Sequence, residues 1–189
     1  MKKSLWAAML IAAVGIAPPA KGQDETPKLE AYAGYDYVRF NVTSQSNGVT
    51  SSDSYNANGG GGQLAYNANK WLGVVGDLTG YVATSQGQPV AGVFSYLFGP
   101  RLSLRRGRMT PFAQLLFGGA FATAGIGHGI YANSFAMATG GGLDIQISRH
   151  IAIRPVQAEY FMTTFPGNGF TDRQNNFRFS AGVVFRLVR

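Results

Sequence analysis

The stretch that decides the fold is FRFSAGVVFRLVR, residues 177–189, in which two kinds of side chain alternate. Phe177 and Phe185 share one parity with other apolar residues, while Arg178 and Arg186 share the opposite parity. A period of two is typical of a β-strand, because successive side chains point to opposite faces of a sheet. The segment therefore predicts a strand with one aromatic face and one face that carries arginine.

The composition agrees with a sheet that has one apolar and one polar side. The 189 residues include 26 glycines and no cysteine, with 13% charged and 13% aromatic residues. The missing cysteine excludes disulfides, Cys-based metal sites and a lipid anchor on an N-terminal cysteine. No pattern of metal ligands stands out, and we predict no metal and no cofactor. The length suits a single domain.

The N-terminal segment predicts export from the cytoplasm. Residues 1–22 begin with lysines, continue with an apolar run and end in prolines and small residues. This layout is typical of a cleaved secretory signal peptide, and the run is shorter than the ~20 residues of a transmembrane helix. Cleavage is expected between Gly22 and Gln23. Loss of three lysines lowers the net charge from +7 to +4, and no basic stripe with interleaved aromatics indicates a nucleic-acid partner.

The period of two recurs along residues 23–189 and predicts eight strands in one domain. Their expected ranges are Leu29–Asn41, Asn58–Asn67, Trp71–Ala83, Val90–Leu104, Thr110–Thr123, Ser134–Ile147, Ile151–Thr163 and Phe177–Val188. Short polar turns alternate with longer connections, of which 43–54 and 164–176 are the largest. This rhythm predicts an all-β fold, a single eight-stranded antiparallel up-and-down β-barrel with both termini at the short-turn end.

The parity of the charges predicts which face of the barrel is outside. Arginine on a lipid face near mid-bilayer costs about 2–4 kcal/mol, so the phenylalanine face of the final strand is expected to point outward. A soluble lipocalin-like barrel would show the reverse facing. The sequence therefore predicts a transmembrane barrel. Residues available for aromatic girdles at its two interfaces are Tyr32, Tyr35, Tyr37, Tyr66, Trp71, Tyr81, Tyr96 and Tyr160.

The charged residues on the inner faces predict a network that fills the lumen. Its expected members are Glu30, Asp36, Asp77, Arg101, Asp144, Arg154, Glu159, Arg178 and Arg186. Eight strands leave room only for side chains, and these charges should pair because an unpaired buried charge is costly. Arg154 and Glu159 have opposite parity, so either one faces outward or a bulge near Pro155 changes the register. The glycine runs at 59–62 and 140–142 are expected to face a crowded interior.

Several segments resemble the eight-stranded outer-membrane β-barrel family, the OmpA-like and OmpX-like barrels. AYAGYDYVRF is similar to the opening strand of that family, LFGPRLSL followed by TPFAQLLFGGA to its central hairpin, and IAIRPVQAEYFMT to its penultimate strand. The ending SAGVVFRL is similar to the C-terminal assembly signal, with Ser180, Gly182, Phe185 and Leu187 in its positions, although Leu187 is not aromatic and two residues follow it.

The resemblance implies a monomer in a bacterial outer membrane, without the peptidoglycan-binding domain of longer relatives. Its implied partners are outer-membrane lipid, lipopolysaccharide and, during insertion, the barrel-assembly machinery. The sequence favours a structural or surface-interaction role with no catalytic site, and the long connections could bind a surface ligand. The alternatives are a narrow small-solute pore and a lipid A-modifying enzyme. A triad of His128, Ser134 and Asp172 is conceivable, but the glycine-rich segment around His128 disfavours a preorganised base.

Overall fold

The computed structural model describes residues 26–46, 49–85, 88–124, 131–166 and 171–188. The predicted signal peptide at 1–22 lies outside these ranges. The strands are β1 (Leu29–Ser46), β2 (Val49–Asn67), β3 (Leu72–Ser85), β4 (Gln88–Ser103), β5 (Met109–Ala124), β6 (Tyr131–Gln146), β7 (Ile151–Pro166) and β8 (Thr171–Val188). No helix in the described part of the chain is long and apolar enough to cross a membrane, a finding that does not concern strands.

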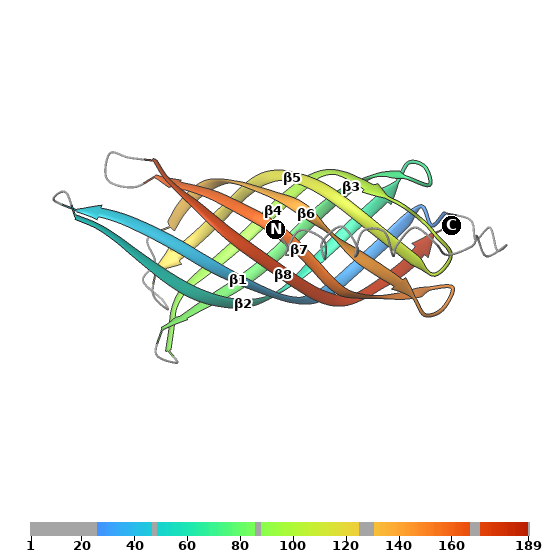
Figure 1. Ribbon diagram of the computed structural model, residues 1–189, viewed down its shortest axis with the longest axis horizontal. Helices are drawn as coiled ribbons and strands as arrows, with labels where there is room; N and C mark the ends of the chain where they lie inside the picture. Colours follow the sequence, from blue (N-terminus) through green and yellow to red (C-terminus); the bar gives the residue numbers. More distant parts are fainter. Residues whose placement is uncertain (1–25, 47–48, 86–87, 125–130, 167–170, 189) are drawn as a thin grey trace, which may run out of the picture.

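The eight strands close into one antiparallel barrel in sequence order (Figure 1). Each strand pairs with the next along the chain, and β1 closes the barrel against β8, from Leu29 opposite Val188 to Arg39 opposite Phe177. The predicted all-β up-and-down barrel is therefore confirmed. In Figure 1 the start of β1 and the end of β8 lie with the short turns on the right, and the long hairpins project to the left.

The strands extend farther into the long hairpins than predicted. β1 pairs with β2 out to Ser46 opposite Val49, and β7 pairs with β8 out to Pro166 opposite Thr171. The segments 43–54 and 164–176, predicted as the largest loops, are therefore mostly paired strand, and that prediction is wrong. Their serines, threonines and asparagines show no apolar alternation, so the sequence pattern stops before the backbone ladder does.

The facing of the strands agrees with the inside-out prediction. Phe98 in β4, Leu78 in β3 and Phe177 in β8 are 66%, 56% and 56% exposed on the outer surface. Their neighbours along each strand are buried, as Asp77 is in β3 and Arg178 is in β8. Because the large apolar side chains point outward and the charged ones inward, the barrel has the facing that suits a lipid surround and not that of a soluble barrel.

A bulge in β7 places both Arg154 and Glu159 inside the barrel. Pro155 and Val156 both face outward, and the pairing with β8 steps from Arg154 opposite Gly182 to Gln157 opposite Ser180. Three steps on β7 therefore match two on β8. The extra residue in the bulge changes the parity between the two charges, so both point inward. Of the two alternatives that the sequence left open, the structure therefore contains the bulge near Pro155.

Deleting Val156 is expected to leave a folded barrel, because Arg154 and Gln157 would then be two positions apart and both would still point inward. Inserting one alanine after Ala158 is expected to be far more damaging, because it would turn Glu159 toward the outer face. The mobility of the folded form on SDS gels without boiling measures both. Loss of the folded form in the deletion variant alone would contradict this account of the bulge.

Candidate functional site

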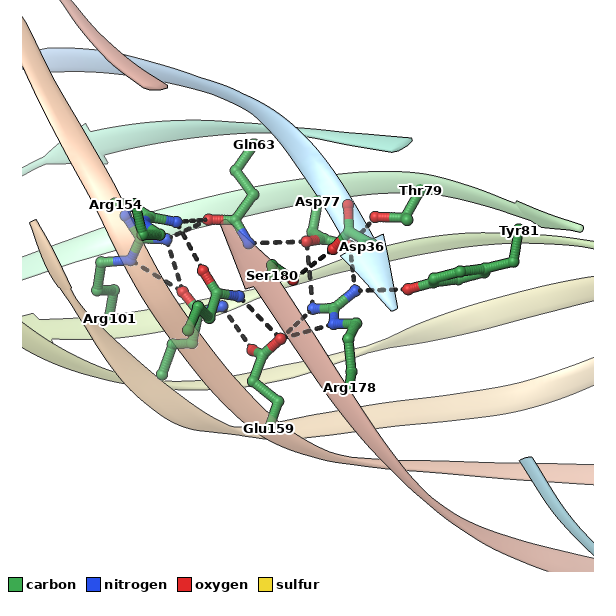
Figure 2. A network of polar contacts seen from close by, with 12 residues as sticks. Asp36, Gln63, Asp77, Thr79, Tyr81, Arg101, Arg154, Glu159, Arg178 and Ser180 are labelled. Carbon is green, nitrogen blue, oxygen red and sulfur yellow. Dashed lines mark hydrogen bonds and ion pairs between the residues drawn. The ribbon is translucent and has the colours of Figure 1, made fainter. Parts of the chain in front are cut away.

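A network of polar side chains lies in the lumen, and Figure 2 shows Arg178 at one side of it and Arg154 and Arg101 at the other. The Arg178 side chain is completely buried and lies between two carboxylates. Its Nη1 and Nη2 donate to the two oxygens of Asp77 at 3.0 and 3.2 Å, and its Nε donates to Glu159 Oε2 at 2.6 Å. Nη1 also donates to the Tyr81 hydroxyl at 3.2 Å. One guanidinium thus bridges β3, β7 and β8 across the barrel.

A second ion pair lies beside it, between Arg154 of β7 and Asp144 of β6. Nε and Nη2 of Arg154 donate to the two oxygens of Asp144 at 2.6 and 3.0 Å, a bidentate geometry that favours strong, directional pairing. The neighbouring Arg101 of β4 donates instead to amide oxygens, those of Gln114 at 2.7 and 2.9 Å and Gln63 at 2.5 Å. Both guanidinium carbons lie 4.4 Å from the ring centroid of Phe112, where cation–π attraction offsets part of their desolvation.

Three glutamines join these groups into one network. Gln63 Oε1 accepts from both Arg101 and Arg154 while its amide nitrogen donates to Asp77 at 2.8 Å. The amide nitrogens of Gln114 and Gln157 donate to Glu159 at 2.7 and 2.8 Å. Each amide therefore offers its oxygen to arginine and its nitrogen to a carboxylate. These glutamines were not among the predicted members of the network, although their inward parity on β2, β5 and β7 is a signal that indicates them.

A separate ionic cluster closes the short-turn end of the lumen. Glu30 of β1 lies 3.0 Å from Nη2 of Arg105 and 3.3 Å from Nε of Arg186, and it accepts from Asn67 at 2.8 Å. Arg105 belongs to the turn before β5 and was not among the predicted members, because strand parity says nothing about turn residues. With it, five carboxylates and five guanidinium groups line the described interior.

Asp36 differs from the other carboxylates because its direct partner is neutral. The Ser180 hydroxyl of β8 donates to Asp36 Oδ1, and Oδ2 has no hydrogen-bond partner among the described residues. The carboxylate packs over Gly61 of β2, where a Cβ atom would lie 2.7 Å from Oδ2. A side chain at that position would displace Asp36. The glycine runs, predicted to face the interior, do so only in part. Gly59, Gly61, Gly140 and Gly142 follow the inward parity, whereas Gly60, Gly62 and Gly141 follow the outward one.

Beyond the charges, toward the long hairpins, the lumen becomes apolar. Val38 and Phe40 of β1, Leu116 of β5 and Phe161 of β7 are buried in one cluster with Tyr81 and several alanines. The Phe40 and Phe161 rings each lie 6.3 Å from the Tyr81 ring. Side chains thus fill the interior on both sides of the Arg178 ion pairs. The apolar part of this filling was not predicted, because only charged residues were expected in the lumen.

Two of the tyrosines proposed for the interfacial girdles are in the lumen instead. Tyr32 and Tyr81 are 5% and 2% exposed, and the Tyr32 ring lies 4.4 Å from the guanidinium carbon of Arg154. Tyr32 has the same parity as Glu30, and Tyr81 has the same parity as Asp77. Both tyrosines were therefore predictable as inward residues and not as members of the girdles. Tyr35, Tyr66, Trp71 and Tyr96 do lie on the outer surface. Tyr37 and Tyr160 are outward and half-buried.

The residues of the predicted C-terminal assembly signal occupy both faces of β8. Ser180 and Gly182 point inward, whereas Phe185 and Leu187 are exposed on the outer surface. A Cβ atom at position 182 would collide with the backbone oxygen of Ala33 on β1, so this glycine permits the close approach of the strands that seal the barrel. The role of the four residues in assembly stays a prediction.

No group of metal ligands is found in the described part of the chain, and Ser134, the described member of the conceivable triad, is bonded to backbone. No cluster of three metal-ligating side chains occurs there. The Ser134 hydroxyl donates to the carbonyl of Phe135 at 2.8 Å and accepts from the Thr164 N–H at 2.8 Å, so it is held by backbone. His128 and the Asp172 side chain lie outside the described residues. The arrangement of the lumen suits rigid cross-linking of strands.

Comparison with known proteins shows the fold. No protein-family model and no curated protein matches the sequence. Among solved structures, Neisserial surface protein A is 14% identical with a TM-score of 0.63, covering 85% of this chain and 97% of its own. OprG, an outer-membrane protein of Pseudomonas aeruginosa, is 13% identical with a TM-score of 0.52 over 85% of this chain and 96% of its own.

A third similar structure is Ail, the attachment invasion locus protein of Yersinia pestis, in complex with the heparin analogue sucrose octasulfate. It is 17% identical, with a TM-score of 0.51, and the alignment covers 85% of this chain and 99% of Ail. The chain therefore has the fold of eight-stranded outer-membrane barrels, spanning nearly the whole of each. At these identities the likeness concerns the fold.

Proposed function

We propose that this protein is an integral barrel of a bacterial outer membrane that acts as a closed scaffold and displays its long hairpins at the cell surface. Its export would use the signal peptide at 1–22, with cleavage near Gln23. The observation that carries the proposal is the filled lumen, in which ion pairs around Arg178 and an apolar cluster around Tyr81 occupy successive levels. A rigid interior of this kind supports a structural or surface-interaction role.

Support for the membrane setting comes from the outer surface. Large apolar side chains project from every strand, for example Leu64, Val74, Phe98 and Phe179. Monomeric soluble proteins rarely expose apolar patches larger than a few hundred Å². The apolar outer face of the strands and the fold of the similar structures also support a membrane setting. In this proposal the barrel is a monomer, reaches the membrane through the barrel-assembly machinery, and contacts lipid and lipopolysaccharide.

Outer membranes from an expressing strain test the setting. The protein should be in the outer-membrane fraction, and its mobility on SDS gels should shift on boiling, because a folded membrane barrel resists SDS until heated. If the protein is instead soluble in the periplasm and its mobility does not shift on boiling, the proposal is overturned. A lipocalin-like ligand carrier would then be the leading hypothesis.

Planar bilayers separate the closed scaffold from the narrow pore. The purified barrel should give no discrete conductance steps, because Arg178, Arg154 and the Tyr81 cluster occupy the lumen. Regular steps that disappear with boiled protein would favour the small-solute pore. Mass spectrometry of lipid A from the same strain tests the third alternative, and an unchanged lipid A is expected if the barrel has no lipid A-modifying activity.

A further inference from the structure

One backbone contact repeats around the short-turn end of the barrel. The carbonyl groups of Lys28, Trp71, Arg108 and His150 each accept a hydrogen bond from the strand that follows in the barrel. The donors, in the same order, are the N–H groups of Asn67, Ser103, Gln146 and Arg186, at 2.8, 2.8, 2.7 and 2.9 Å. Every short turn, and the residue before β1, is thereby fastened to its neighbour. The side chains at this end consequently project from fixed positions around the rim.

The exposed charged side chains at this rim, among the described residues, are all basic. Lys28, Lys70, Arg106, Arg108 and Arg149 are all exposed, and we call them the basic rim. The turns at 68–71, 104–108 and 147–150 contain no acidic residue. Glu30, on the inner side of the rim, is already shared by two arginines. This end of the described barrel therefore has an excess of positive charge.

The opposite half of the outer surface lacks a comparable cluster among the described side chains. There the exposed cation is Arg39, on the outward face of β1. Among the described side chains, the exposed positive charge is therefore concentrated at the short-turn end of the barrel.

The basic rim borders directly on the apolar outer surface. Trp71 follows Lys70 and is 52% exposed, while Leu104 and Met109 flank the turn that holds Arg108 and are 50% and 54% exposed. Ile147 and Ile151 flank Arg149 in the same way. A cation next to an exposed tryptophan at the edge of an apolar band is at the level of lipid headgroups. Each turn is too short to carry its charge far beyond that level.

We propose that the basic rim binds the headgroups of anionic phospholipids, the phosphatidylglycerol class, in the leaflet that surrounds the short turns. This inference rests on the proposed membrane setting, in which short turns lie on the periplasmic side. The rim supplies point charges on three turns at headgroup depth, and anionic phospholipid offers phosphate at the same depth. Acidic peptides of the cell wall carry a similar charge, but they would approach from below the turns and not at the edge of the apolar band.

Trp71 provides a reporter beside the rim. All proteins begin at Gln23, after the proposed cleavage site, so Trp6 and the three lysines of the signal peptide are absent and Trp71 is the sole tryptophan. The rim variant combines Lys70→Gln, Arg108→Gln and Arg149→Gln, and the matched control is Arg39→Gln. Each purified mature protein is refolded into phosphatidylcholine vesicles. The vesicles contain the same fraction of either dibrominated phosphatidylglycerol or dibrominated phosphatidylcholine, and the quenching of Trp71 by the two brominated lipids is compared. Boiling-dependent gel mobility verifies folding in each sample.

Brominated phosphatidylglycerol should quench more strongly, with an apparent affinity about fivefold higher for each cation that contacts a headgroup. The preference should persist in the Arg39→Gln control and fall at least about fivefold in the rim variant, which keeps Lys28 and Arg106. High salt should weaken the preference because screening shortens the range of surface charges. Equal quenching by both lipids in a folded barrel would overturn the lipid inference and leave the proposed function intact. So would a preference that is undiminished in the rim variant.

Two other outcomes would also overturn the lipid inference. They differ in whether the proposed membrane setting is retained. Failure of every protein to fold in vesicles and show the gel shift would remove the proposed membrane setting and this inference with it. Rim-dependent sedimentation of the folded barrel with peptidoglycan sacculi, without a lipid preference, would assign the rim to cell-wall carboxylates instead.

Discussion

Replacing Arg178 with methionine is expected to lower the free energy of unfolding by about 3–5 kcal/mol, because the change leaves Asp77 and Glu159 buried without their cation. Both carboxylates are 2% exposed, and Arg178 is the guanidinium that both contact. Methionine fills similar space and packs well in irregular cores, so the effect measures lost charge more than lost volume. Urea unfolding in lipid vesicles, followed by the folded band on unboiled gels, gives the difference.

Two further variants show whether the unpaired charges are the cause. Adding Asp77→Asn and Glu159→Gln to Arg178→Met removes the uncompensated carboxylates and should restore a large part of the lost stability. Arg39→Met, an exposed arginine of the outer surface, should change stability by no more than about 0.5 kcal/mol. A triple variant no more stable than Arg178→Met would show that the ion pairs act through packing and not through charge.

The alternation of apolar and polar residues along each strand predicts much of the fold. Where this alternation ends, the sequence no longer predicts how far the strands extend. In β8 the phenylalanines and arginines alternate without interruption, so the pattern predicted both the strand and its facing. In β1 and β2 beyond Asn41 the side chains are mostly polar on both faces, and the pattern ends although the backbone pairing continues to Ser46. Backbone hydrogen bonds between antiparallel strands do not require an apolar face, which makes such extensions invisible to a hydrophobic pattern.

The sequence predicted which charged residues face the lumen, but it did not predict which of them pair with one another. Inward parity identified the acids and arginines, but pairing depends on positions across the barrel that a one-dimensional pattern does not contain. Arg178 meets Asp77 from a strand 101 residues away in the sequence. Arg105 reaches Glu30 from a turn, and turns have no parity. The bulge at Pro155 is intermediate, because the odd spacing of Arg154 and Glu159 indicated that something must change there.

Replacing Leu78 with arginine is expected to lower the free energy of unfolding in vesicles by about 2–4 kcal/mol. The outward residues of β3 run from Leu72 to Thr84, and Leu78 is the middle one, 56% exposed on the apolar surface. Charge at this depth has no water to solvate it, so arginine must distort the bilayer or the barrel to reach the interface.

The same substitution at Thr84 is the matched control. Thr84 points outward from the same strand, six positions nearer the long hairpins, where an arginine can reach headgroups and should cost about 0–1 kcal/mol. The two variants add the same side chain, so the difference between them measures depth in the membrane. Equal costs at both positions would show that no lipid surrounds the middle of β3, and the inside-out facing of the barrel would then need another explanation. A large cost at Leu78 alone would mean that the outward leucines, valines and phenylalanines of this barrel are solvated by hydrocarbon.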